Sequence, residues 1–174
     1  LEEISQQLDI PVVGVILPGT RGAVKSSKNQ RIGVIGTLGT IKSQSYEQAI
    51  RSRDLNAHVI SLACPKFVPL VESNQYQSPI AKKVVAETLV PLQNKKIDTL
   101  ILGCTHYPLL RPIIQNVMGR QVKLIDSGAE TITEVSMLLD YFKLGNLYAT
   151  KTGELTCYTT GSTKLFDEIA NEWL

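Results

Sequence analysis

The segment Gly103-Cys104-Thr105-His106-Tyr107-Pro108 places a thiol two residues before an imidazole, directly after a short apolar run. A thiol that ionises near neutral pH can accept or release a proton. A neighbouring histidine can pair with that thiol or with a substrate carboxylate. The same pair could support nucleophilic catalysis, and a cysteine after a strand can also be a small structural hydrophobe. Cys104 and His106 are therefore the first candidates for acid–base chemistry.

A glycine-rich segment, Gly36-Thr37-Leu38-Gly39-Thr40, supplies two hydroxyl groups to a second candidate site. Its glycine spacing does not match the GxGxxG fingerprint of dinucleotide-binding proteins. Exposed backbone amides at a helix start, together with Thr37 and Thr40, could instead hold a carboxylate or a small anion. The alternative is purely structural, with Thr40 as a helix N-cap and Thr37 as a turn residue.

Other polar residues near the predicted strands are weaker candidates for a functional site. Asp126-Ser127-Gly128 follows an apolar run and is a further candidate for ligand contact. Glu72 ends an apolar helical segment, where it is either a solvated residue or a carboxylate that orients His106. Cys64 and Cys157 are expected in the core.

Composition limits the class of protein. The 174 residues are 43% hydrophobic and 20% charged with a net charge of +2, which fits one globular domain or two small ones. The near-neutral charge argues against general nucleic-acid or membrane-surface binding. No apolar run approaches the roughly 20 residues of a membrane helix. The three widely spaced cysteines favour a reducing, cytosolic setting, and no CxxC or His-rich tract suggests a metal site.

Short β-branched runs alternate with helical patterns along the chain. The apolar runs VVGVI, IGVI and LILG indicate strands covered on both faces, as in a parallel sheet between helices. The alternation predicts an α/β fold with a doubly wound, mainly parallel sheet, whose ligands bind at the carboxyl ends of the strands. Strands are expected at 11–16, 31–35, 57–62, 99–102, 122–125 and 155–159; helices are expected at 40–52, 79–90, 130–142 and 162–174.

Five stretches together resemble the bacterial glutamate racemases of the aspartate/glutamate racemase family. They are IPVVGVILPGTRGAV at 10–24, IGVIGTLGTIKSQSYEQAI at 32–50, ACPKFVPLVE at 63–72, IDTLILGCTHYPLL at 97–110 and LIDSGAET at 124–131. The resemblance implies interconversion of L- and D-glutamate by two cysteines, without cofactor or metal, to supply D-glutamate for peptidoglycan. It implies a cytoplasmic enzyme that is a homodimer at full length and binds neither nucleic acid nor membrane.

The resemblance also implies roles for particular residues. Cys104 matches the family's second catalytic cysteine, with His106 tuning it and Glu72 supporting the histidine. Inversion at a carbon needs a base on one face and an acid on the other, with roles that reverse with the hand of the substrate. The substrate-binding positions are Thr37, Thr40, Thr105 and His106.

The family's first cysteine lies in a Cys-Asn-Thr stretch that does not occur in residues 1–174. The resemblance therefore implies one complete lobe at 18–125, with 1–17 and 126–174 as the remnant of a second, truncated lobe. We expect this chain alone to be inactive as a racemase. Three alternatives stay open: a non-catalytic lobe that binds an acidic ligand or partner, an aspartate racemase fragment, and a Cys–His hydrolase.

Overall fold

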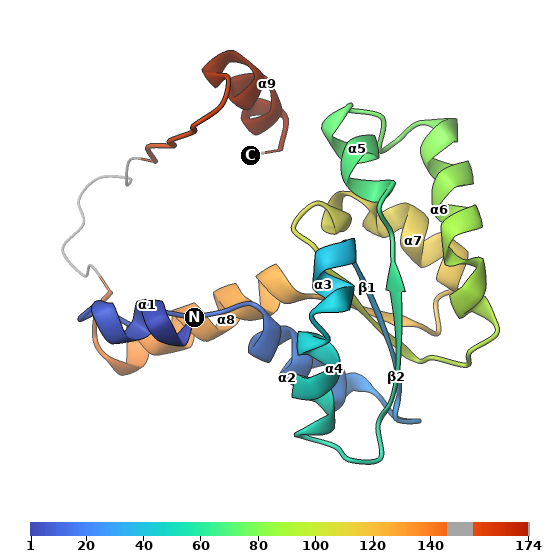
Figure 1. Ribbon diagram of the computed structural model, residues 1–174, viewed down its shortest axis with the longest axis horizontal. Helices are drawn as coiled ribbons and strands as arrows, with labels where there is room; N and C mark the ends of the chain where they lie inside the picture. The colour runs from blue at the N-terminus through green and yellow to red at the C-terminus, as the bar shows by residue number, and fades with distance from the viewer. Residues whose placement is uncertain (146–154, 174) are drawn as a thin grey trace. The chain divides into compact units, whose positions relative to one another are not determined.

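The computed structural model describes residues 1–145 and 155–173 (Figure 1). Its contacts divide the chain into two units, Leu1–Leu138 and Leu139–Leu174. Among the described residues, the first unit holds the sheet and the starts of eight α-helices and one 3-10 turn, and the second holds α9 (Thr163–Trp173). Within the described ranges, no helix is long and apolar enough to cross a membrane.

The four strands of the sheet are all parallel, as the sequence predicts. They are β1 (Arg31–Gly36), β2 (His58–Ala63), β3 (Thr99–Gly103) and β4 (Lys123–Asp126), in the order β2-β1-β3-β4. The chain leaves β1 to form β2 on one side and then returns past β1 to form β3 on the other. The strand order therefore reverses between β1 and β3, which is the point where parallel sheets of this kind bind ligands.

Helices cover both faces of the sheet (Figure 1). On one face α2 (Ile16–Ser26) packs against α4 (Ser45–Arg51) and against β3 and β4. On the other face α6 (Pro79–Gln93) packs against α7 (Arg111–Met118). The shorter elements of this unit are α1 (Glu2–Gln7), α3 (Leu38–Lys42), α5 (Phe67–Glu72) and a 3-10 turn at Tyr107–Leu110, and α8 (Ser127–Tyr141) extends into the second unit.

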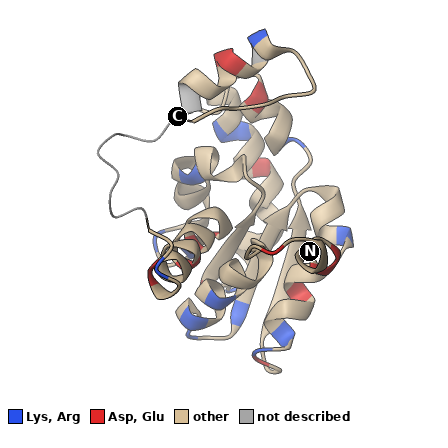
Figure 2. Ribbon diagram, turned by 90° about the vertical axis from the view of Figure 1, so that its left-hand side faces the viewer, with Lys and Arg blue, Asp and Glu red and all other residues tan. Residues whose placement is uncertain are grey.

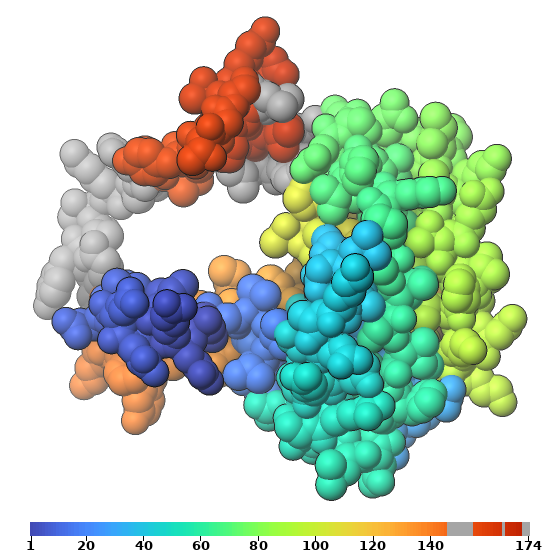
Figure 3. Space-filling view, viewed as in Figure 1, coloured from blue at the N-terminus to red at the C-terminus, as the bar shows by residue number. Residues whose placement is uncertain are grey.

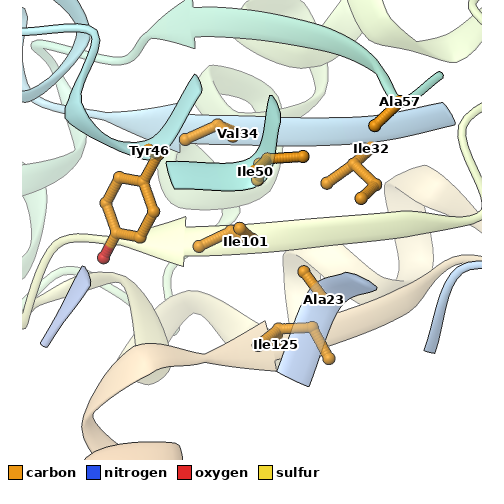
Figure 4. Packing of buried hydrophobic residues seen from close by; sticks show 8 residues of the cluster. All are labelled: Ala23, Ile32, Val34, Tyr46, Ile50, Ala57, Ile101 and Ile125. Carbon is orange, nitrogen blue, oxygen red and sulfur yellow. The ribbon is translucent and has the colours of Figure 1, made fainter. Parts of the chain in front are cut away.

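The core follows from the alternation of side chains along the strands. Ile32 and Val34 of β1 and Ile101 of β3 point to the same face and meet Ala23 of α2 and Ile50 of α4 (Figure 4). Their neighbours in the sequence point to the opposite face and are also buried: Ile35, Leu100 and Leu102. β1 and β3 are therefore apolar on both sides because both sides are covered.

Asp98 lies just before β3, at the end of the sheet opposite to the carboxyl ends of the strands. Its Oδ1 accepts hydrogen bonds from the hydroxyls of Ser27 (2.6 Å) and Thr99 (3.0 Å), and its Oδ2 accepts from the backbone N–H groups of Lys28 (2.6 Å) and Asn29 (2.8 Å). Partial burial by itself would raise the pKa of Asp98, but these hydrogen bonds favour the carboxylate and hold its pKa below the ordinary value.

Three predicted elements in the first unit differ from the observed ones. Residues 11–14 form no strand, and helix α2 begins at Ile16. The helix expected at 40–52 is divided into α3 and α4 because Gln44 between them has a left-handed backbone, with φ of 52°. Helix α6 continues past Pro91 to Gln93; the proline removes one backbone hydrogen bond, and the helix ends two residues later.

The C-terminal part of the chain differs more. The helical spacing in 130–142 predicts that Ile132 and Phe142 point inward, but they are 69% and 53% exposed. Residues 155–159 form no strand, and Cys157 is exposed rather than in a core. The helix expected at 162–174 is confirmed as α9, and Leu174 itself lies outside the described residues.

Candidate active site

Thr37 and Thr40 lie at the carboxyl end of β1 and contact each other. Thr37 is the N-cap of α3: its Oγ1 accepts the backbone N–H of Thr40 at 3.2 Å, and the two hydroxyl oxygens are 3.0 Å apart. Thr37 is therefore the N-cap, and the structural alternative with Thr40 as the cap is wrong. Both side chains stay partly exposed, which leaves hydroxyl surface available to a ligand.

Thr40 also reaches the end of β3 because two facing glycines make room for it. Gly36 and Gly103 are register partners at the ends of β1 and β3. A Cβ atom on Gly36 would lie 2.9 Å from Thr40 Cγ2, and one on Gly103 would lie 3.6 Å from the same methyl carbon and 2.8 Å from the carbonyl oxygen of Ile35. The glycine-rich segment and the cysteine segment therefore meet at the point where the strand order reverses.

Cys104 follows Gly103 directly and is partly exposed. Its Sγ lies 3.9 Å from His106 Nδ1, which is also 3.2 Å from the hydroxyl of Thr105. His106 Nε2 lies 3.3 Å from Glu72 Oε1 at the end of α5. When Nε2 carries the proton and donates it to Glu72, Nδ1 is the acceptor for the Thr105 hydroxyl or the Cys104 thiol.

This arrangement connects three separate elements around one thiol. Figure 3 shows the yellow surface of the segment after β3 between α3 in cyan and α5 in green. The Glu72 side chain is 54% exposed and that of His106 is 21% exposed, so water weakens the contact between them but leaves its orienting effect on the imidazole. The geometry suits proton transfer to and from a group placed against Cys104.

A pocket of about 250 Å³ lies beside Cys104, between the ends of β3 and β4. Thr105 and Asp126 contribute polar atoms to its wall. Asp126 Oδ1 accepts the backbone N–H groups of Gly128 (2.9 Å) and Ala129 (3.2 Å), and so caps the start of α8. Asp126 and its neighbours were candidates from their position after a strand, and the structure places them at this pocket.

Tyr46 and Ser127 form a buried hydrogen bond of 2.8 Å in the wall of the same pocket. Sequence reasoning missed Tyr46, because it gives only an aromatic residue in a predicted helix. Burial raises the pKa of Tyr46, the hydrogen bond with Ser127 lowers it, and the nearby Cys104 and Asp126 raise it further. The net effect is a raised pKa, so this phenol stays protonated at neutral pH.

The other two cysteines are in different surroundings. Cys64 is fully buried, as expected, and burial raises its pKa to about 12. The Tyr107 hydroxyl donates to the carbonyl of Cys64 at 3.0 Å, and burial raises the pKa of Tyr107 as well. Cys157 is exposed in the second unit. Of the three, Cys104 is the thiol that lines the pocket.

Charged residues and metal ligands give little further signal. Figure 2 shows lysine and arginine residues spread over several helices and loops. Among residues 1–145 and 155–173, no group of three or more His, Cys, Asp or Glu side chains is placed to hold a metal ion.

Comparison with known proteins places this site in context. The family described as Asp/Glu/Hydantoin racemase matches residues 1–135. A glutamate racemase of Enterococcus faecalis is 68% identical over all 174 residues, which span 64% of its length. The crystal structure of a glutamate racemase isoform from Bacillus anthracis superposes with a TM-score of 0.90 at 42% identity, over 99% of this chain and 64% of that one.

A further solved structure contains a ligand. The glutamate racemase of Francisella tularensis, in complex with D-glutamate, has a TM-score of 0.87 at 32% identity, over 99% of this chain and 64% of that protein. The present chain thus spans a little under two thirds of the length of the relatives that it matches.

Proposed function

The chain belongs to the Asp/Glu/hydantoin racemase family, and from this premise we propose that it carries the Cys104 half of a glutamate racemase active site. The observation that carries the proposal is the position of the Cys104 thiol. It lies between the His106–Glu72 pair and a pocket, at the reversal of strand order where Thr40 also lies.

Cys104 is one of the two acid–base groups in this proposal. As a thiolate it takes the hydrogen from the α-carbon of one enantiomer and becomes a thiol. As a thiol it returns a proton to the planar intermediate formed from the other enantiomer. Because the α-hydrogen is weakly acidic, hydrogen-bond donors must stabilise the charge that develops on the substrate carboxylate. We assign that task to Thr37, Thr40, Thr105 and His106.

The second acid–base group must act on the opposite face of the substrate. Cys64 is buried, and the pocket beside Cys104 contains no other sulfur among the residues described. By the resemblance to the family, the second group is a cysteine outside this chain. We propose that residues 18–125 form one lobe and that 1–17 and 126–174 belong to the other. We expect the 174-residue chain to form no D-glutamate from L-glutamate.

Alkylation of Cys104 tests whether glutamate binds at this site. We expect glutamate to slow the reaction of Cys104 with iodoacetamide several-fold, as followed by peptide mass spectrometry. The exposed Cys157 is an internal control whose rate should not change. Thr40→Val, which keeps the methyl group against Gly36, should abolish the protection. Thr88→Val is the matched control, because the Thr88 hydroxyl only donates to Val84 within α6.

Proton exchange in D2O then separates an enzyme from a binding lobe. A single acid–base group can remove and return hydrogen on one face, so one enantiomer of glutamate should exchange its α-hydrogen without forming the other. Cys104→Ser should stop the exchange. Protection of Cys104 without any exchange would favour a non-catalytic lobe that binds acidic ligands, and absence of protection would contradict the proposed substrate.

The wider role follows the resemblance to the family. We propose that the full-length protein is a homodimer that supplies D-glutamate for peptidoglycan in the cytoplasm, using thiol chemistry without a cofactor. Sedimentation of the full-length protein, with D-glutamate production as the readout of activity, tests this part separately.

A further inference from the structure

The backbone of Cys64 connects three elements that surround the candidate site. Its carbonyl oxygen accepts the backbone N–H of Phe67, the first residue of α5, at 3.1 Å. It also accepts the hydroxyl of Tyr107, the first residue of the 3-10 turn, at 3.0 Å. The N–H of Cys64 donates to the carbonyl of Gly36 at the end of β1, at 2.9 Å. One residue thus fixes α5 and the turn to the edge of the sheet where Thr40 lies.

The contact between Glu72 and His106 closes these hydrogen bonds into a ring. From the Cys64 carbonyl, α5 leads from Phe67 to Glu72, whose Oε1 lies 3.3 Å from His106 Nε2. His106 is joined by a peptide bond to Tyr107, and the Tyr107 hydroxyl returns to the Cys64 carbonyl. Helix α5 and the turn are therefore connected at one end by Tyr107 and at the other by the Glu72–His106 contact.

Helix α5 depends on tertiary contacts for its position. Its six residues are too few to form a stable helix alone in water. Its apolar side is buried, and the rings of Phe67 and Tyr107 meet edge to face with centroids 5.2 Å apart and planes at 68°. The carboxylate of Glu72 is on the exposed side. The placement of the helix, more than any packing of Glu72 itself, therefore decides how close that carboxylate lies to His106.

Tyr107 fixes the turn as firmly as it fixes the helix. Its side chain is fully buried, and its backbone N–H donates to the carbonyl of Cys104 at 3.2 Å. The carbonyl of His106 accepts the N–H of Leu109, also at 3.2 Å. Burial raises the pKa of Tyr107, so its hydroxyl keeps its proton and remains a donor to Cys64. His106 is thus attached to a residue whose backbone, ring and hydroxyl are all held (Figure 3 shows the surface of this region).

The distance between α5 and the turn also controls the chemistry of the imidazole. A carboxylate only accepts hydrogen bonds, so the contact with Glu72 favours the tautomer with a proton on Nε2. Nδ1 then faces the Cys104 sulfur at 3.9 Å and the Thr105 hydroxyl at 3.2 Å as an acceptor. A turn that moved away from α5 would release this preference.

We propose that Tyr107 is a positioning residue of the candidate active site. By joining the turn to the Cys64 carbonyl and to the ring of Phe67, it keeps His106 within reach of Glu72 and so holds the imidazole proton on Nε2. Tyr107 acts through His106 and not on a substrate. The proposal rests on the proposed function only for the part that His106 plays beside Cys104, because the contacts themselves belong to the chain without substrate.

The imidazole tautomer can be measured directly in the chain without glutamate. The sequence contains two histidines, and His58, exposed at the start of β2, is an internal reference for His106. With 15N-labelled histidine at about pH 9, where ordinary imidazoles are neutral, the ring-nitrogen shifts give the ratio of the Nε2–H form to the Nδ1–H form. Cys104, which also contacts the imidazole, is unchanged in every variant.

Tyr107→Phe should lower this ratio for His106 about two- to fivefold, the equilibrium effect of losing a partly exposed charged contact. Glu72→Ala should lower it at least as much, and adding Tyr107→Phe to Glu72→Ala should change it no further, because both act through one contact. Asp98→Asn, which loosens the opposite end of the sheet, is the control for a general loss of stability and should leave the ratio unchanged.

A wild-type ratio in folded Tyr107→Phe would overturn the proposal. So would a further fall in the double variant, which would show that Tyr107 acts without Glu72, or an equal fall in Asp98→Asn. Should Tyr107→Phe not fold, Phe67→Leu provides the test: it keeps the hydroxyl but removes the edge-to-face contact, and the same criteria apply to it. Glutamate protection of Cys104 is measured separately, so failure of the proposed substrate and failure of this positioning role give different results.

Discussion

Gly103→Ala places a methyl group where the structure has no room for it. The new Cβ atom would lie 2.8 Å from the carbonyl oxygen of Ile35 and 3.1 Å from the ring of Tyr46. The carbonyl belongs to β1, which is hydrogen-bonded to strands on both sides, so it cannot move without disturbing the sheet. The tyrosine ring is held by its own buried hydrogen bond. Neither neighbour can yield easily.

The size of the effect follows from two opposing terms. Overpacking against a rigid neighbour costs about 3 kcal/mol at the upper end of the usual range. Replacing glycine by alanine restricts the unfolded chain and returns about 0.5–1 kcal/mol. Gly103→Ala should therefore lower the free energy of unfolding by about 2 kcal/mol. Gly39→Ala is the matched control: its Cβ would meet nothing closer than 3.9 Å, so the variant should be more stable by about 0.5–1 kcal/mol.

Urea unfolding of the two variants provides the comparison. The single tryptophan, Trp173, lies in the second unit, so far-UV circular dichroism is the appropriate probe of the sheet. Gly103→Ala should also change the alkylation rate of Cys104, whereas Gly39→Ala should not. Equal or inverted stabilities of the two variants would refute the close packing of β3 against β1 at this point.

The structure leads to three further predictions, on Asp98, on Thr20 and on the order in which the cysteines react. Asp98→Ala should cost about 2–4 kcal/mol through the loss of four hydrogen bonds, while Asp98→Asn, which can keep most of them, should cost less. The pKa of Asp98 is lowered on folding, so its contribution is present above the unfolded-state pKa and is lost as pH falls through the folded-state value; acid titration of both variants measures this. Thr20→Val should raise the free energy of unfolding by about 1 kcal/mol in urea, since the Thr20 hydroxyl is buried without a partner in the described chain, and a loss would contradict this. Cys157 should alkylate readily, Cys104 more slowly, and Cys64 only after unfolding; early labelling of Cys64 would show that its burial is wrong.

The sheet was predictable because its strands have a local signature. After their first residues, Arg31 and Thr99, the strands β1 and β3 are apolar at every position and end in glycine, and both are buried on two faces. A strand with this composition requires helices on both sides, so the fold class follows from the strands alone. The segments 11–16 and 155–159 were also predicted as strands but pair with no strand in the described structure. A strand requires a partner as well as a pattern, and the pattern cannot reveal whether the partner is there.

The candidate site was only partly predictable for a related reason. Cys104, His106 and Thr105 are neighbours in the sequence, so their proximity was foreseeable. Glu72 contacts His106 across more than thirty residues, so the residues alone left open whether it was solvated or oriented His106, and the resemblance to a family favoured the pair. Tyr46 gave no signal, because its significance depends on a buried contact with a residue 81 positions away.

The register of the sheet explains why Cys104 reaches the site at all. Side chains alternate between the faces of a sheet, so a slip of one residue between β1 and β3 would put Leu102 or Cys104 opposite Gly36. Either side chain would occupy the space in which the Thr40 methyl group now lies. The pair of facing glycines therefore excludes the neighbouring registers, and the register that remains places the thiol just beyond the edge. The position of the Cys104 thiol is thus set by two residues that have no side chains.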